Sequence, residues 1–132
     1  MELERDGVMA GRKHRKPTFA ECMQMMRRRD PQVREDGFHA LRGHPEHLDA
    51  LVRELQTETA HGLRCWLLEL IGETRRPDAV PILAEYLTSE DESFRDWAVY
   101  GLQRIDTKEA RRLLWQAKQR HLRPHADPSD TA

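Results

Sequence analysis

Apolar residues recur along this chain with the spacing of amphipathic helices, and no segment shows the alternation of a strand. Thr18, with Glu21 three residues later, has the pattern of a capping box, which marks a helix start. Similar start and stop signals divide the rest of the sequence into short helical segments. The pattern therefore predicts an all-α chain, with helices over residues 18–28, 30–42, 45–55, 60–71, 78–87, 91–104 and 107–118.

Several helix ends are marked by residues with known preferences. Asp30 and Asp78 are predicted N-caps, because a short acidic side chain accepts a hydrogen bond from a free N–H of the first turn. Pro81 falls in the first turn of its helix, where its missing N–H costs no hydrogen bond. Gly43 and Gly72 are predicted to end the second and fourth helices, because glycine readily adopts the left-handed conformation of a C-terminal cap.

The helices repeat in pairs of nearly constant length. Three arginines, Arg34, Arg64 and Arg95, lie 30 and 31 residues apart, and the apolar positions around them agree in character. The first apolar residues of the preceding helices align in the same way: Phe19, Leu48 and Val80. A period of about 30 residues built from two helices is typical of a helical solenoid, in which each pair buries its apolar stripe against its neighbours.

Two parts of the sequence resemble HEAT repeats, specifically the short bacterial kind called PBS-lyase-like: DPQVREDGFHALRG at 30–43, and DAVPILAEYL with DESFRDWAVYGLQRI between 78 and 105. The most specific features are Pro81 and the Asp-x-x-hydrophobic-Arg pattern of Asp30–Arg34 and Asp91–Arg95, which the middle repeat lacks. The resemblance covers residues 18–118. It implies an α-solenoid of about three HEAT-like helical hairpins plus a closing C-terminal helix.

The repeated arginines Arg34, Arg64 and Arg95 fall at the border of the apolar stripe, about 100° around the helix from the residue before each. The apolar stem of an arginine can cover the joint between helices while its guanidinium binds an acid or a helix end of the neighbouring repeat. The resemblance to HEAT repeats implies this structural role for all three.

Both ends of the chain are predicted to be tails, with residues 1–17 a disordered basic N-terminal tail and 119–132 a polar C-terminal tail. The 22 basic and 23 acidic side chains nearly cancel, so no net field attracts the chain to nucleic acid or to a membrane. Cys22 and Cys65 stand alone in the sequence, which favours a reduced, cytoplasmic protein. No apolar run reaches the roughly 18 residues that a membrane-spanning helix needs.

The resemblance also implies that the second helices of the pairs line a concave surface. Two tryptophans, Trp66 and Trp97, occupy equivalent positions there, and they either pack between repeats or form an aromatic platform for a protein partner. Acidic residues beside them would suit a basic segment of that partner. The candidate partner-binding residues are Trp66, Trp97, Glu69, Asp96, Tyr100, His39 and Gln103.

Nucleic-acid binding is the alternative function. A basic tail alone gives weak, salt-sensitive contact with nucleic acid, and the second helices offer acids along with few arginines. Solvated charge is therefore the favoured interpretation of the basic runs, and nucleic acid is not an expected partner. The candidate residues for this alternative are Arg12, Lys13, Arg15, Lys16, Arg27, Arg28 and Arg29.

No catalytic constellation is apparent among the reactive side chains. His39, His44, His47 and Asp49 could supply metal ligands, but His44 and His47 flank a proline-initiated turn instead of sharing one helix face, so no metal site is predicted. Cys65 has a single nearby cation to lower its pKa, so it is not predicted to be a nucleophile.

These observations predict a non-enzymatic protein-interaction module without a cofactor. It would act as an adaptor, a regulatory subunit, or an inhibitor of the immunity-protein type. A lyase role, which the PBS-lyase-like resemblance raises, has no catalytic residue in this sequence to support it.

Overall fold

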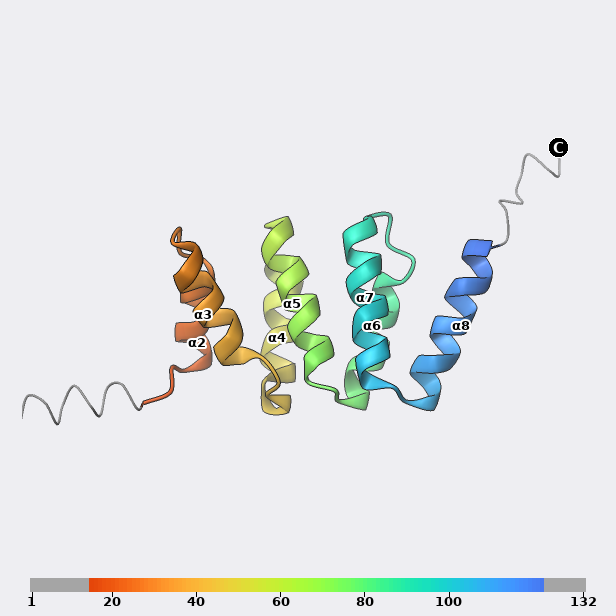
Figure 1. The fold of residues 1–132 in the computed structure, drawn as a ribbon, viewed down its shortest axis with the longest axis horizontal. Coiled ribbons are helices and arrows are strands. Elements are labelled where there is room, and N and C mark those ends of the chain that lie inside the picture. The colour runs from red at the N-terminus through yellow and green to blue at the C-terminus, as the bar shows by residue number, and fades with distance from the viewer. Residues whose placement is uncertain (1–14, 123–132) are drawn as a thin grey trace, which may run out of the picture. The chain divides into compact units, whose positions relative to one another are not determined.

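The computed structural model describes residues 15–122, and within that range the chain is helical with no strand (Figure 1). The predicted all-α class is therefore confirmed for these residues. Of the two predicted tails, residues 1–14 and 123–132 lie outside the described range. The elements are α2 (Phe19–Met26), α3 (Pro31–Leu41), the 3-10 turn η1 (Pro45–His47), α4 (Leu48–Thr57), α5 (His61–Glu73), the 3-10 turn η2 (Pro77–Ala79), α6 (Val80–Tyr86), α7 (Glu92–Ile105) and α8 (Lys108–Leu122).

The chain divides after Leu41 into two compact units, and the first contains the hairpin of α2 and α3. The capping box predicted at its start is present: the Thr18 hydroxyl accepts from the Glu21 N–H at 3.1 Å, and the Glu21 carboxylate accepts from the Thr18 N–H at 2.8 Å. Asp30 accepts from the N–H of Gln32 at 2.9 Å, as expected of an N-cap. Local sequence thus fixes both helix starts in this unit.

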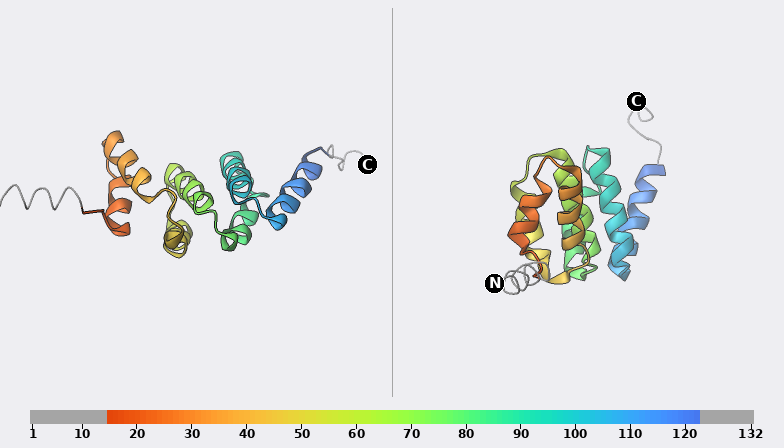
Figure 2. Two further views of the ribbon diagram at one scale, coloured as in Figure 1. Left: turned by 60° about the horizontal axis from the view of Figure 1, so that its bottom comes forward. Right: turned by 60° about the vertical axis from the view of Figure 1, so that its left-hand side comes forward.

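The second unit, from Arg42 onward, contains the hairpins α4–α5 and α6–α7 followed by α8. Figure 2 shows α4 and α6 in one layer of this unit and α5 and α7 in the other. Leucines at the expected apolar positions form the core between the layers, and Leu51, Leu67, Leu83 and Leu102 are fully buried. Burying such side chains contributes about 2 kcal/mol each, which is why the repeat pattern is sufficient to specify the stack.

Gly72 does not end its helix, contrary to the prediction. Helix α5 continues to Glu73, and Gly72 lies buried in its last turn against Gly101 of α7. A Cβ atom at position 72 would come within 2.5 Å of the Gly101 Cα, so both glycines are needed for the two backbones to approach this closely. Arg75, with a φ of 56°, makes the left-handed turn after the helix.

Two further boundaries differ from the prediction. Asp78 is not an N-cap, because it lies inside η2 and pairs with Arg76 at 2.5 Å, and α6 starts at Val80 with Pro81 in its first turn. Helix α8 ends at Leu122, four residues beyond the predicted end, so the first four residues of the predicted polar tail are helical. Polar residues there continue the helix because α8 needs only one apolar side.

Candidate functional site

Helices α5 and α7 pack directly against each other and carry the candidate surface, which we call the α5–α7 face. Asp96 and Gln103 are exposed on this face, and the other side chains are half-buried. Such partial burial leaves area on each aromatic residue for a partner to cover. The face consists of Trp66, Glu69, Asp96, Trp97, Tyr100 and Gln103.

Trp97 and Tyr100, one turn apart in α7, contact each other edge to face, with ring centroids 5.3 Å apart and planes at 84°. This is a favoured aromatic geometry, so each ring limits the rotamers of the other. The negative charge of Glu69 in α5 contributes to a raised pKa of Tyr100, after the larger effects of Glu73 and of burial. The face therefore combines paired aromatic rings with acidic groups.

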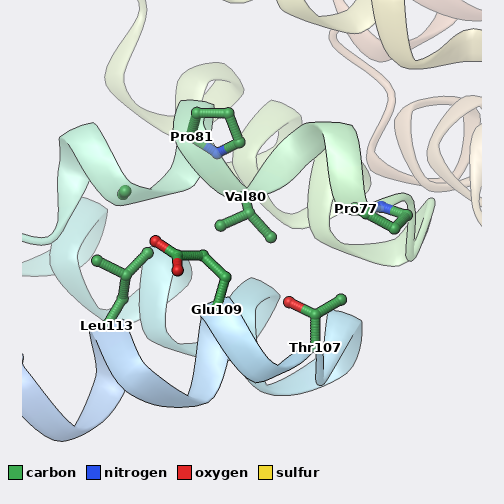
Figure 3. Close-up of a pocket in the computed structure, with 7 residues that line it drawn as sticks. Pro77, Val80, Pro81, Thr107, Glu109 and Leu113 are labelled. Carbon is green, nitrogen blue, oxygen red and sulfur yellow. The ribbon is translucent and has the colours of Figure 1, made fainter.

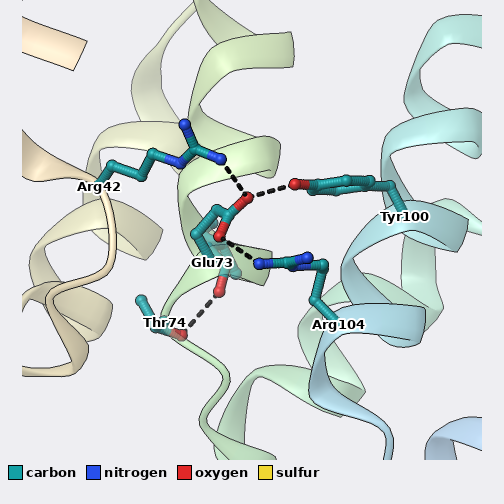
Figure 4. Close-up of polar contacts among 6 residues, drawn as sticks. Arg42, Glu73, Thr74, Tyr100 and Arg104 are labelled. Carbon is teal, nitrogen blue, oxygen red and sulfur yellow. Dashed lines mark hydrogen bonds and ion pairs between the residues drawn. The ribbon is translucent and has the colours of Figure 1, made fainter. Parts of the chain in front are cut away.

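Glu73, in the last turn of α5, is the centre of a polar cluster at one end of this face (Figure 4). Its side chain is only 5% exposed. One carboxylate oxygen accepts from the Tyr100 hydroxyl and from the Arg42 guanidinium at 3.4 Å, and the other accepts from Arg104 at 3.4 Å. The Arg104 guanidinium also lies 5.8 Å from the centre of the Tyr100 ring. A buried carboxylate with three donors ties α5 to α7.

The electrostatics of this cluster favour an ionised Glu73. Burial alone would raise the pKa of its carboxyl, but the hydrogen bond from Tyr100 and the charges of Arg104 and Arg42 hold that pKa below its usual value. The same hydrogen bond, together with burial, raises the pKa of Tyr100. Tyr100 thus remains a donor and Glu73 an acceptor at neutral pH.

Sequence reasoning missed Glu73 and Arg104, although a signal for them exists. Arg42, Glu73 and Arg104 are each 31 residues apart, one repeat length, and their charges alternate in sign. The alignment on Arg34 and Arg64 does not reveal this 31-residue spacing, because those two arginines are 30 residues apart. A search for opposite charges at 31 residues would have found the cluster.

Each repeat arginine donates to a backbone carbonyl six residues earlier, in the loop of its own hairpin. Arg64 donates to the carbonyl oxygen of Glu58 at 2.8 Å, and Arg95 to that of Ser89 at 2.6 Å. Arg34 donates at 3.4 Å to the carbonyl of Arg28. The helix end that these arginines bind therefore belongs to the same hairpin, and not to the neighbouring repeat as expected.

Arg64 also reaches the following hairpin. Its guanidinium donates to the Tyr86 hydroxyl at 3.1 Å and lies 5.2 Å from the centre of the Phe94 ring. His61 stacks on the same ring at 5.0 Å and pairs with Asp91 at 2.9 Å. Asp91 in turn caps α7 by accepting from the Phe94 N–H. Hence Asp91 binds a histidine and a helix N-terminus, and Phe94 is a half-buried contact between hairpins.

The remaining candidate residues belong to the first unit or lie outside the described range. His39 is exposed near the end of α3, where its ring contacts Phe38 at 5.5 Å. Arg15 pairs with Glu21 at 3.1 Å, and Lys16 is exposed. Arg27, Arg28 and Arg29 are exposed where α2 ends, and Arg12 and Lys13 fall outside residues 15–122.

An apolar groove of about 550 Å³ lies between α6 and α8 (Figure 3). Pro81 and Ala84 form one side, and Leu113 of α8 forms the other. Glu109 is at its edge, where it pairs with Arg112. The groove shows that α8 packs less closely against α6 than α5 does against α7.

The family model for HEAT repeats matches residues 48–121, more than half of the chain. The chain belongs to the HEAT-repeat family. The predicted resemblance is thereby confirmed, although residues 18–47 lie outside the match. No curated protein and no solved structure matches the chain significantly. HEAT repeats generally mediate protein–protein interactions and are typically non-catalytic.

The surroundings of Cys65 in this HEAT-repeat protein do not favour a reactive thiolate. Burial, followed by the charge of Asp91, raises the pKa of the half-buried Cys65 thiol, with Arg64 opposing them, so the thiolate is disfavoured. Within residues 15–122 no three metal-ligating side chains come together. Over the same residues, no helix has the length and apolar character to cross a membrane.

Proposed function

We propose that this HEAT-repeat protein binds a partner protein through the α5–α7 face, as an adaptor, a regulatory subunit or an inhibitor. The observation that supports this most strongly is the aromatic pair Trp97–Tyr100, half-buried beside the exposed Asp96. Tryptophan and tyrosine are the residue types most often found as energetic anchors of protein interfaces, because they bring large area at a low entropic cost.

The packing beneath the face supports a preformed binding surface. The Gly72–Gly101 contact brings α5 and α7 close together, and Glu73 holds Tyr100 by a hydrogen bond. A side chain fixed before binding loses little rotamer freedom when a partner arrives, and that lowers the cost of association. The partner then needs only complementary shape and charge.

The charge of the face favours a basic partner segment. Asp96 is an exposed carboxylate beside Trp97, whereas Glu73 is buried and neutralised by Arg42 and Arg104. The exposed charge next to Trp97 is therefore the negative charge of Asp96. A segment with lysine or arginine beside an apolar residue would fit, because opposite charges speed encounter and orient the partner.

Affinity capture from the native host, followed by measurement with the purified partner, tests this function. The decisive variant is Asp96→Arg, and Glu85→Arg is its matched control, because both replace an exposed acid by arginine and Glu85 lies on α6 in the other layer. We expect Asp96→Arg to weaken binding by about tenfold or more and Glu85→Arg to leave it unchanged. Equal affinity of the two variants would refute the proposal that the partner binds through the α5–α7 face.

Trp97→Ala separates the two interpretations of the tryptophans. If Trp97 anchors a partner, the variant loses affinity by about thirtyfold while its helicity by circular dichroism stays that of the wild type. If Trp97 only packs between repeats, the melting temperature falls and the affinity is retained.

A further inference from the structure

Helix α8 presents a tryptophan at a position that is charged in α4 and α6. The apolar positions Leu48, Val80 and Ala110 align in the repeat, and five residues after each stand Arg53, Glu85 and Trp115. Trp115 is 63% exposed, and it is the only large apolar side chain in residues 15–120 that is exposed to this degree. A position that faces solvent in two repeats therefore carries the residue type most enriched in interface anchors.

Basic side chains surround Trp115 on α8. Arg111 and Arg112 lie one turn before it and Lys118 one turn after it, and all three are exposed. Residues 108–120 contain five basic side chains and one acidic side chain. Trp115 also lines a shallow hollow of about 510 Å³ with Gln116, Gln119 and Arg120.

Two of these arginines already bind carboxylates within the chain. Arg111 pairs with Asp106 at 2.9 Å, and Arg112 pairs with Glu109. Both pairs are exposed and are therefore worth little, so a partner's carboxylates can exchange with them at small cost. Lys118 is an exposed cation one turn beyond the ring.

We propose that the outer surface of α8 around Trp115 binds an acidic segment of a partner protein. The indole supplies apolar contact area, and the surrounding cations bind carboxylates at its rim, the arrangement of a hot spot enclosed by polar residues. This surface on α8 is separate from the α5–α7 face and carries the opposite charge. The chain would then bring an acidic and a basic segment together.

Charge argues against two other occupants. A second copy binding α8 to α8 would bring two strongly basic helices together, which like-charge repulsion opposes. A nucleic acid would have to extend beyond α8, and residues 42–105 carry twelve acidic and seven basic side chains. That adjacent surface repels a long polyanion but not a short acidic segment.

The test uses a random-peptide phage library selected on the full-length chain, with the enriched peptides measured by fluorescence anisotropy. We expect the enriched peptides to include a group that is rich in Asp and Glu and contains an aromatic or leucine residue. The Trp115→Ala and Lys118→Glu variants should each bind these acidic peptides about tenfold or more weakly than the wild type, and their melting temperatures should be unchanged. The matched control Arg53→Glu, at the equivalent position of α4, should leave its affinity unchanged.

The other outcomes each contradict the proposal. The proposal is wrong if the selection enriches no acidic peptides. It is also wrong if the Trp115→Ala variant binds the acidic peptides with the same affinity as the wild type. Tight binding of oligothymidylate that depends on Trp115 would identify a nucleic-acid surface instead. Self-association in sedimentation velocity that disappears in Trp115→Ala would identify a second copy as the occupant. None of these measurements depends on Asp96 or Trp97, so they leave the α5–α7 face to its own test.

Discussion

Two helix–helix contacts of the second unit, α5–α7 and α6–α8, differ in how closely they are packed. In the α5–α7 contact, Gly72 meets Gly101 backbone to backbone, and the buried Glu73 receives donors from both sides. In the α6–α8 contact, Leu113 is half-buried and an apolar groove of about 550 Å³ stays open. One sequence repeat therefore produces a tight junction and a loose one.

The difference shows that apolar periodicity alone sets the order of the helices but not how closely they approach. Close approach depends on particular small or polar residues at the crossing point. Where they are present, α5 and α7 form a rigid base for Trp97 and Tyr100. Where they are absent, α8 keeps apolar and aromatic area available on its surface.

The largest effect is expected from filling the glycine contact. Gly72→Ala places a Cβ within 2.5 Å of the Gly101 Cα, so the two helices must separate, and we expect a loss of about 3 kcal/mol in the free energy of unfolding. Urea denaturation followed by circular dichroism measures it. The control is Gly62→Ala in the same helix, where the added Cβ meets nothing within 4 Å. It should be neutral or stabilise by up to about 1 kcal/mol; similar losses in both variants would show that the α5–α7 contact is not tight.

Leucines at equivalent positions of α6 and α8 compare how firmly these two helices are packed. Leu83→Ala removes a fully buried side chain that lies against Gly101, and we expect a cost of about 3 kcal/mol. Leu113→Ala removes a half-buried side chain and should cost about 1 kcal/mol. Chemical denaturation of both variants gives the difference of about 2 kcal/mol. Equal costs would mean that α8 is as firmly packed as α6.

The Glu73 cluster gives the α5–α7 contact a pH dependence. Because the pKa of Glu73 is lowered in the folded protein, its contribution is complete above its unfolded pKa of about 4.3 and is lost as the pH falls through the lower folded value. Glu73→Gln should cost about 1.5 kcal/mol at pH 7 and less at acid pH. Unfolding experiments at a series of pH values compare it with the wild type; parallel curves for the two proteins would contradict the prediction.

The smallest effect is expected at Trp115. Since its side chain is 63% exposed, Trp115→Ala should change the free energy of unfolding by no more than about 0.5 kcal/mol. Differential scanning calorimetry on the variant and the wild type checks this. A clear loss of stability would show that the indole packs against the fold and is not free for a partner.

Local sequence predicted the helices and the repeat, but not the residues that join hairpins. The capping box at Thr18 and Pro81 in the first turn of α6 depend on neighbours a few residues away, and both are where the sequence indicated. Gly72 was assigned as a helix end, because glycine serves equally for a cap and for a close approach. Only its partner Gly101, 29 residues later, decides between the two.

The sequence indicated only those features of the candidate site that depend on a single helix. Helical spacing placed Asp96, Trp97 and Tyr100 on one side of α7, since that depends on a single helix. Glu73 was overlooked because a buried carboxylate is understood only with its donors one repeat away, Arg42 and Arg104. Whether a tryptophan is exposed or buried likewise depends on the next helix and not on its own segment.

Native-state hydrogen exchange by NMR tests the contrast between the two contacts most directly, because it reports the opening free energy of each helix in the intact protein. We expect the central amides of α5 and α7 to exchange only through global unfolding, and those of α8 to exchange through a separate opening of lower free energy. Protection of α8 equal to that of α5 and α7 would contradict the account, since the junctions on either side of α7 would then be held equally firmly.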